Sequence, residues 1–209
     1  MKRLYLMRHG QTLYNLQKLV QGRCDSPLTD LGVAQARSAS SWLAAQRVNF
    51  DRICSSPIGR ALNTAHIARE VLQESGECGD VPCVEVVDGL KERSYGPYEQ
   101  GPQAAVPASV WDPGEALVPE GGEGSIELRA RMVRTLTALM EDPAVTTLLA
   151  VSHGSATLQF KLAWEHLAAC DQGQPLGNCC ILVFDFDEER REFSNIEIVN
   201  QVGYHNSLV

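Results

Sequence analysis

Short apolar runs without polar alternation mark the strands that this sequence predicts. The first run spans residues 4–7 and leads directly into Arg8-His9-Gly10. Such a run is typical of a strand buried on both faces, as in a parallel sheet. Residues 147–152 repeat the pattern and lead into His153-Gly154. Further strands are predicted in residues 52–57, 84–87, 180–186 and 192–199.

Helical periodicity predicts four helices between these strands. The first is expected to begin after Thr29, whose hydroxyl suits an N-cap. The second is expected over residues 59–72 and the fourth over residues 155–169, with residues 11–25 left as a polar loop. The third is expected to start at Ser125 as its N-cap, and a core-facing stripe follows: Met132, Val133, Leu136, Leu139 and Met140.

Residues 94–124 form the least regular part of the chain. Five prolines forbid a long helix there: Pro97, Pro102, Pro107, Pro113 and Pro119. Apolar residues give the segment contacts of its own: Val106, Val110, Trp111, Leu117 and Val118. We therefore expect one domain over residues 1–209 with an inserted lid at about 94–124, not two domains joined by a linker.

Charge and cysteine content narrow the choice of partners and compartment. The net charge is −8, with 18 basic and 26 acidic residues, which argues against nucleic-acid and membrane partners. The seven cysteines include no C-x-x-C pair and favour small buried residues in a reducing compartment. The residues after Met1 are too few for a signal core, and we expect a cytoplasmic protein. A homodimer stays among the alternatives for the oligomeric state.

The candidate functional residues are two histidines and two arginines. Each of the two similar strands delivers a histidine, His9 and His153, to the same sheet edge, where open α/β sheets place ligands. Arg8 precedes His9, and Arg60 follows another strand at the start of a helix. A guanidinium pairs two phosphate oxygens, so this group suggests a phosphoryl site. The first stretch alone is equally compatible with a strand that ends in a polar turn.

Several motifs occur in an order typical of one family. They are Arg8-His9-Gly10-Gln11-Thr12 with Asn15, Gln21-Gly22 with Asp25-Ser26-Pro27-Leu28-Thr29 and Gly32, Ser55-Ser56-Pro57 with Arg60 and Thr64-Ala65, Leu90-Lys91-Glu92 with Tyr95-Gly96, and Ser152-His153-Gly154. With them the chain resembles the histidine phosphatase superfamily, which has the phosphoglycerate mutase-like fold. Arg-His-Gly alone is a weak signal, whereas the ordered set is specific.

The resemblance implies a fold and a set of catalytic roles. The fold is an α/β three-layer α/β/α sandwich with a mostly parallel central sheet. His9 would attack phosphorus as a neutral imidazole, with the Gly10 carbonyl holding its tautomer. His153 would donate a hydrogen bond to a transferring oxygen. Glu92 would act as general acid and then general base, with Glu99 as the competing carboxylate.

The remaining site residues also follow from the resemblance. The catalytic set is completed by Arg8 and Arg60. The substrate-binding set is expected to be Arg8, Asn15, Gln21, Gly22, Arg60, His153 and Gly154, with the backbone amide of Ser155 in the phosphate cradle. No metal and no cofactor are expected. The other histidines, His66, His166 and His205, are interpreted as structural or surface residues.

The segment after Glu92 favours one branch of the family. Phosphoglycerate mutases carry arginines and lysines there, whereas residues 94–128 of this chain contain neither. They contain six acidic residues: Glu99, Asp112, Glu115, Glu120, Glu123 and Glu127. A short lid without positive charge resembles the phosphatase branch. Gln100 and Gly124 depart from the family pattern and leave the lid conformation open.

The sequence therefore predicts a metal-independent phosphomonoester hydrolase that forms phosphohistidine at His9 and acts on small phosphorylated metabolites. Neutral or aromatic leaving groups should be accepted better than polyanions. A cofactor-dependent phosphoglycerate mutase is the first alternative, and a non-catalytic phosphate-binding module is the second. The intact set of His9, His153, Arg8, Arg60 and Glu92 argues against the module.

Overall fold

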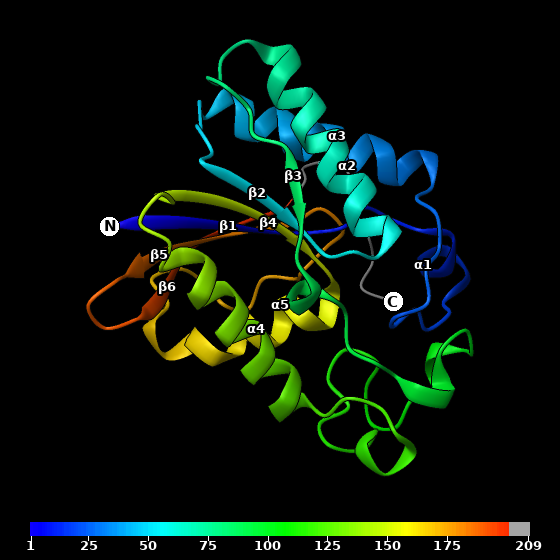
Figure 1. Ribbon diagram of the computed structural model, residues 1–209. Coiled ribbons are helices and arrows are strands. Elements are labelled where there is room, and N and C mark those ends of the chain that lie inside the picture. Colours follow the sequence, from blue (N-terminus) through cyan, green and yellow to red (C-terminus); the bar gives the residue numbers. More distant parts are fainter. Residues whose placement is uncertain (201–209) are drawn as a thin grey trace.

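A six-stranded sheet forms the middle layer of the protein in the computed structural model, which describes residues 1–200 (Figure 1). The strands are β1 (Lys2–Arg8), β2 (Arg52–Ser55), β3 (Val84–Val86), β4 (Thr147–Ser152), β5 (Ile181–Asp187) and β6 (Glu192–Val199). Their order in the sheet is β3-β2-β4-β1-β5-β6. The first four strands in this order form three parallel pairs, and β5 pairs antiparallel with both β1 and β6, so the sheet is mostly parallel as predicted.

Helices cover both faces of the sheet and complete the predicted three-layer sandwich (Figure 1). One face carries α2 (Asp30–Ala45) and α3 (Gly59–Ser75), and the other carries α4 (Ser125–Met140) and α5 (Gly154–Trp164). Side chains of β1 alternate between the two cores. Leu4 and Leu6 join the core beneath α4 and α5, and Tyr5 and Met7 join the core beneath α2 and α3. This double burial explains the unbroken apolar run of β1.

The structure corrects several predicted boundaries. A short helix, α1 (Leu13–Gln17), lies inside the segment expected to be a loop, and Thr12 and Asn15 form its capping box. The helix expected over 155–169 ends at Trp164, and a 3₁₀ turn, η5 (Glu165–Leu167), follows. Ser125 is the first residue of α4, and Gly124 occupies the N-cap. Residues 201–209, and with them His205, lie outside the described residues.

The N-cap prediction for α2 is confirmed. The Thr29 hydroxyl accepts a hydrogen bond from the Gly32 backbone N–H at 3.0 Å. The predicted core stripe of α4 is buried at four of its five positions, and Val133 is only partly buried. Within residues 1–200, no helix is long and apolar enough to cross a bilayer.

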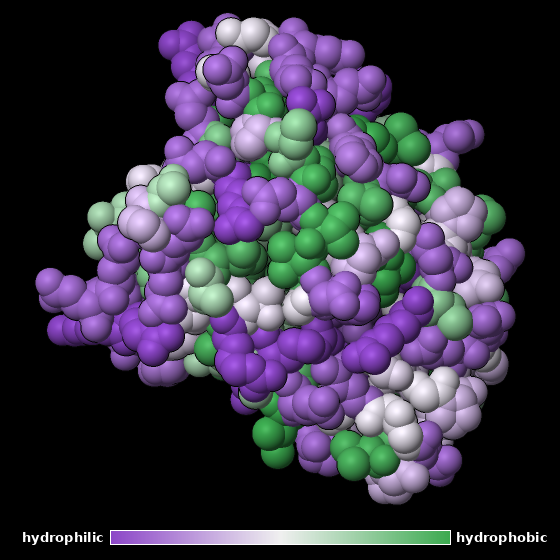
Figure 2. Space-filling view, in the orientation of Figure 1, coloured by the Kyte–Doolittle hydropathy of each residue, from purple (hydrophilic) through white to green (hydrophobic). Residues whose placement is uncertain are grey.

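Residues 94–124 lie beyond the carboxyl ends of the parallel strands (Figure 1). As the prolines predict, the segment contains only 3₁₀ turns: η2 (Gly96–Tyr98), η3 (Gln103–Ala105) and η4 (Val118–Glu120). A further turn, η1 (Asp88–Leu90), precedes it. Tyr95, Val106 and Leu117 pack with Val20 into a small core separate from those on the sheet. Hydrophilic residues cover most of the face seen in Figure 2.

Candidate active site

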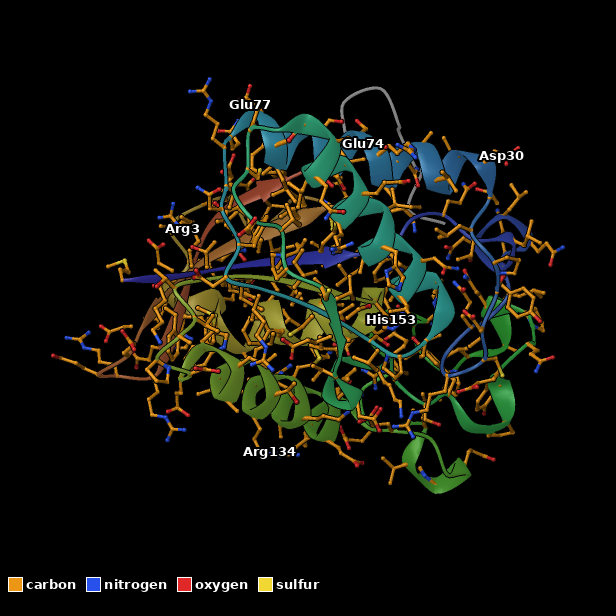
Figure 3. All side chains as sticks on the ribbon, turned by 45° about the horizontal axis from the view of Figure 1, so that its top comes forward. Arg3, Asp30, Glu74, Glu77, Arg134 and His153 are labelled. Atoms are coloured by element: carbon orange, nitrogen blue, oxygen red, sulfur yellow. The ribbon has the colours of Figure 1, made fainter. Side chains whose placement is uncertain are left out.

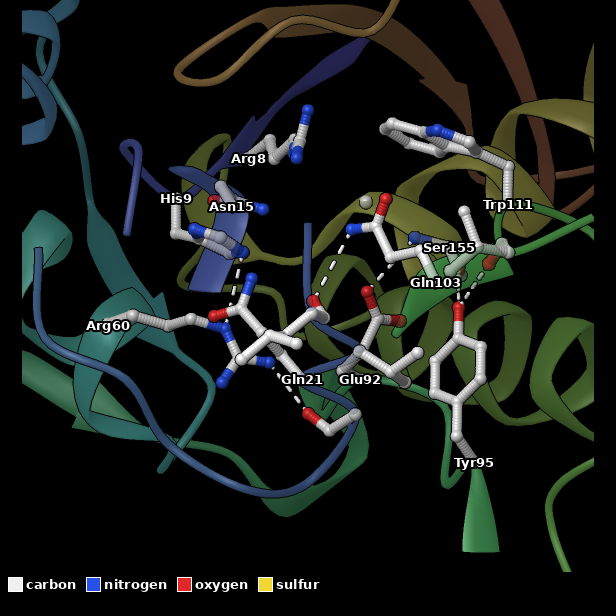
Figure 4. A pocket seen from close by; sticks show the side chains of 15 residues that line it. Arg8, His9, Asn15, Gln21, Arg60, Glu92, Tyr95, Gln103, Trp111 and Ser155 are labelled. Carbon is white, nitrogen blue, oxygen red and sulfur yellow. Dashed lines mark hydrogen bonds between the residues drawn. The ribbon is translucent and has the colours of Figure 1, made fainter. Parts of the chain in front are cut away.

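A pocket opens at the carboxyl end of β1, where α1, α3, α5 and the 94–124 segment meet (Figure 4). Its volume is about 500 Å³, counting the open space at its mouth. The lining includes eight residues of the predicted set: Arg8, His9, Asn15, Gln21, Gly22, Arg60, Glu92 and Gly154. His153 does not line the pocket surface. It is fully buried, with its ring centroid 5.3 Å from that of His9.

His9 is held as a neutral imidazole. Its Nδ1 lies 2.7 Å from the Gly10 carbonyl oxygen, and the Arg60 Nε–H donates to its Nε2 at 3.3 Å. Because Nε2 accepts, the ring proton belongs on Nδ1, where the carbonyl holds it. Desolvation, and then the positive charges of Arg60 and Arg8, lower the pKa of His9 well below its ordinary value. The ring therefore presents an unprotonated Nε2 next to the two guanidinium groups.

His153 is neutral for the same reasons. Burial, followed by the charge of Arg60, lowers the pKa of His153 well below its ordinary value. Its Nε2 lies 2.8 Å from the Ser56 hydroxyl, which also accepts a hydrogen bond from the Ile58 backbone N–H. The Nδ1 atom is buried and has no hydrogen-bond partner within residues 1–200. A donation from Ser56 to Nε2 places the ring proton on this Nδ1.

The two arginines are fixed by backbone carbonyls. Arg60, from the first turn of α3, donates to the carbonyls of Gly22 and Cys24, each at 2.7 Å. Arg8 donates from Nη1 to the Leu176 carbonyl at 2.8 Å. Its guanidinium lies 4.8 Å from the centroid of the Trp111 ring, a cation–π contact. Both side chains are thus held at the pocket before any ligand arrives.

Glu92 sits at the amino end of α5. Its Oε1 accepts from the backbone N–H groups of Arg93 (2.8 Å) and Ala156 (3.0 Å), and Oε2 accepts from that of Ser155 (3.0 Å). The expectation that the Ser155 amide is free for a phosphate is therefore not met here, because Glu92 already occupies it. Both carboxylate oxygens therefore accept backbone hydrogen bonds at the positive end of the α5 dipole.

Glu99, the competing carboxylate, is not among the residues that line the pocket. Its Oε1 accepts from the backbone N–H groups of Arg23 and Tyr95, and Oε2 accepts from that of Cys24, all at 3.0 Å. It therefore ties the 21–25 loop to the 94–124 segment. Gly22 has φ +54°, and a Cβ there would lie 2.3 Å from Glu99 Oε1.

Asn15 and Gln21 line the pocket with their amide oxygens already engaged. The Thr12 hydroxyl donates to Gln21 Oε1 at 2.9 Å, and the Thr12 backbone N–H donates to Asn15 Oδ1 at 3.1 Å. Asn178 also donates to Asn15 Oδ1, at 3.4 Å. The amide NH₂ groups of Asn15 and Gln21 are consequently the part of each side chain suited to bind an anion.

Much of the remaining wall was not predicted as part of the site. The unpredicted residues are Leu19, Val20, Tyr95, Gln103, Val110 and Trp111, and the wall also includes Ser155, of which only the backbone amide was expected at the site. Tyr95 connects two parts of this wall, because its hydroxyl lies 2.7 Å from Ser155 Oγ and donates a hydrogen bond to the Val110 carbonyl. Tyr95-Gly96 belonged to a recognised motif, but no sequence signal distinguished Trp111 from the other apolar residues of its segment. Within residues 1–200, no group of three His, Cys, Asp or Glu side chains could hold a metal ion.

Two neutral imidazoles between two guanidinium groups define a site suited to a small anion with several oxygens. The family model of the histidine phosphatase superfamily (branch 1) matches residues 4–198. The chain belongs to this superfamily of enzymes. The described fold and the order of the motifs agree with that assignment.

Individual relatives include both mutases and phosphatases. A probable phosphoglycerate mutase, GpmB of Yersinia pestis (strain Pestoides F), is 37% identical over 168 residues, which cover 75% of this chain and 71% of the relative. A structure of phosphoserine phosphatase from Entamoeba histolytica, in complex with 3-phosphoglyceric acid, has a TM-score of 0.73 at 25% identity and covers 97% of this chain and 98% of that chain. Bacillus stearothermophilus YhfR shares the fold, with a TM-score of 0.77, 24% identity and coverage of 93% and 95%.

Proposed function

We propose that this protein is a metal-independent phosphomonoester hydrolase that works through a phosphohistidine at His9. The observation that carries the proposal is the state of His9. Its Nε2 is unprotonated and lies 3.3 Å from Arg60 Nε, and Gly10 holds the opposite ring nitrogen. This is the form of imidazole that can attack phosphorus, next to groups that neutralise a phosphate dianion.

The first half-reaction transfers the phosphoryl group to the enzyme. His9 Nε2 forms the P–N bond while the P–O bond to the leaving group breaks. Arg8 and Arg60 balance the charge on the phosphoryl oxygens, and His153 donates to one of them. Glu92, protonated at this stage, gives its proton to the departing oxygen.

The second half-reaction returns the enzyme to its starting state. A water attacks phosphorus, the P–N bond breaks, and Glu92 as carboxylate takes a proton from the water. The hydrogen bonds from Arg93, Ser155 and Ala156 stabilise the carboxylate needed for this step. Asn15, Gln21, Gly22 and Gly154 complete the proposed binding set around the phosphate.

The pocket wall supports hydrolysis over mutase activity. The cations that line the pocket are Arg8 and Arg60, and residues 94–128 add none. A mutase must hold a second anionic group while the first is exchanged, and apolar side chains from Leu19, Val20 and Trp111 do not provide for this. We therefore expect small monoesters with neutral or aromatic leaving groups to be preferred over bisphosphates.

Phosphoglycerate mutase is the second candidate function. The similarity to a relative named as a probable phosphoglycerate mutase favours it. A non-catalytic phosphate-binding module is the third, and it predicts that no phosphoenzyme forms. We also propose that residues 94–124 act as a lid in one domain. Cytoplasmic location and dimerisation stay predictions of the sequence.

Phosphorus NMR on 3-phosphoglycerate, with EDTA and a trace of bisphosphoglycerate, separates these candidates. Hydrolysis should release inorganic phosphate without 2-phosphoglycerate, and labelled phosphate should be trapped on the protein. His9→Ala should abolish both signals. His66→Ala removes an exposed histidine of α3 and is the matched control. Appearance of 2-phosphoglycerate would establish the mutase, and an active His9→Ala variant would refute the phosphohistidine.

A further inference from the structure

Arg131 does not line the pocket, and the hydrogen-bonding capacity of its guanidinium group is fully used. It projects from α4, and acceptors engage each of its five N–H groups. Nε and Nη2 donate to the two carboxylate oxygens of Glu123 at 2.8 and 2.7 Å. Nη1 donates to the carbonyls of Gly89 and Lys91 at 2.8 and 2.9 Å, and Nη2 also reaches the carbonyl of Glu92 at 3.4 Å.

The three carbonyls belong to the segment that carries Glu92. Residues 91–95 have no regular secondary structure, so this backbone lacks the hydrogen bonds of a helix or sheet. Just before it, the Ser152 hydroxyl of β4 donates to the Leu90 carbonyl at 2.8 Å. One side chain from α4 supplies the missing donors on one side of the segment. On the other side, the Glu92 carboxylate is itself tied to α5 through Ser155 and Ala156.

Glu123 completes the arrangement at the end of the 94–124 segment. Its side chain is 4% exposed, and Arg131 at 2.7 Å, together with Arg23 at 3.7 Å, supplies the positive charge that compensates for burial of this carboxylate. Its backbone N–H donates to the Ser94 carbonyl at 2.8 Å, and its carbonyl accepts from Arg93 Nη1 at 2.9 Å. The Arg131–Glu123 pair therefore links both ends of the 94–124 segment to the backbone of Glu92.

We propose that Arg131 is a positioning residue that sets the location of Glu92 as the proton donor to the leaving group. The inference rests on the proposed function, in which Glu92 is that donor. Lysine is a poor replacement because a single ammonium group carries three donors and lacks the planar fork that spans a carboxylate and two carbonyls. A displacement of the Glu92 backbone would weaken proton transfer while His9, Arg8 and Arg60, held by other elements, stay in place.

Leaving-group dependence distinguishes this role from general support of the fold. p-Nitrophenolate departs without a proton, whereas the alkoxide of glycerol 2-phosphate requires one. Because kcat/KM reports transfer to His9, Arg131→Lys should lower it about 30-fold or more for glycerol 2-phosphate and less than about 3-fold for p-nitrophenyl phosphate. Arg134→Lys is the matched control, because Arg134 lies exposed at the outer margin of the same helix (Figure 3).

A double-mutant cycle tests whether Arg131 acts through Glu92. Glu92→Gln should lower kcat/KM with the same selectivity for glycerol 2-phosphate. In the Glu92→Gln background, Arg131→Lys should then lower kcat/KM little further. Equal losses on both esters, or additive losses in the cycle, would overturn the proposal. If Arg131→Lys does not fold, Glu123→Gln perturbs the same arrangement and should give the same selective loss. If Glu92→Gln itself shows no selectivity, the role proposed for Glu92 fails, independently of Arg131.

Discussion

Acidification below the ordinary histidine pKa should destabilise this protein, because His9 and His153 are buried as neutral imidazoles. Burial and neighbouring arginines hold the pKa of each well below the ordinary 6.5. In the unfolded chain each imidazole regains that ordinary value and binds a proton as the pH falls. Because the pKa of each is lowered in the folded protein, the unfolded state binds more protons as the pH falls, so protons stabilise the unfolded state.

The size of the effect follows from proton linkage. Each histidine that titrates only in the unfolded state contributes about 1.4 kcal/mol between about pH 7.5 and about pH 5.5. The two together should lower the free energy of unfolding by about 2.7 kcal/mol over this interval. The free energy of unfolding begins to fall as the pH drops through the ordinary histidine pKa. It continues to fall until the pH reaches the lowered pKa values of the two histidines in the folded protein.

Urea unfolding at the two pH values measures this difference directly. Buffers must be free of phosphate, because an anion bound between Arg8 and Arg60 would add its own pH dependence. His9→Gln and His153→Gln should each remove about half of the difference, and the double variant should remove nearly all of it. His66→Gln, which removes an exposed histidine, serves as the control and should retain the wild-type difference. A double variant that keeps the full pH dependence would refute the reasoning.

Three further variants probe the pocket and the segment over it. Gly22→Ala should cost about 2 kcal/mol in urea unfolding, because φ is +54° and the new Cβ meets Glu99; unchanged stability would contradict this. Trp111→Ala should raise KM for an aryl phosphate more than for glycerol 2-phosphate in steady-state kinetics, since it removes the aromatic wall beside Arg8. Arg93→Met should lower the free energy of unfolding by about 3 kcal/mol in thermal unfolding, because the fully buried guanidinium donates hydrogen bonds to the Glu123 carbonyl and the Ser125 hydroxyl. A loss below about 1 kcal/mol would show that these hydrogen bonds contribute little.

Local sequence determined the parallel strands and the residues at their ends. The apolar runs before His9 and His153 are buried on both faces, so the pattern had one structural solution, and β1 pairs with β4 residue by residue. Placement of both histidines at one sheet edge followed from that. The ordered motifs then brought Arg60, Asn15, Gln21 and Glu92 to the same pocket.

The tertiary structure alone decided how polar groups far apart in the chain satisfy one another. Glu92 and Glu99 are alike in sequence terms, but the first binds amides at the start of α5 and the second binds amides of the 21–25 loop. Arg131 belongs to no recognised motif, and its guanidinium is held by hydrogen bonds to carbonyls about forty residues earlier in the chain. Such partners depend on long-range packing of irregular backbone, which periodicity and propensity do not encode.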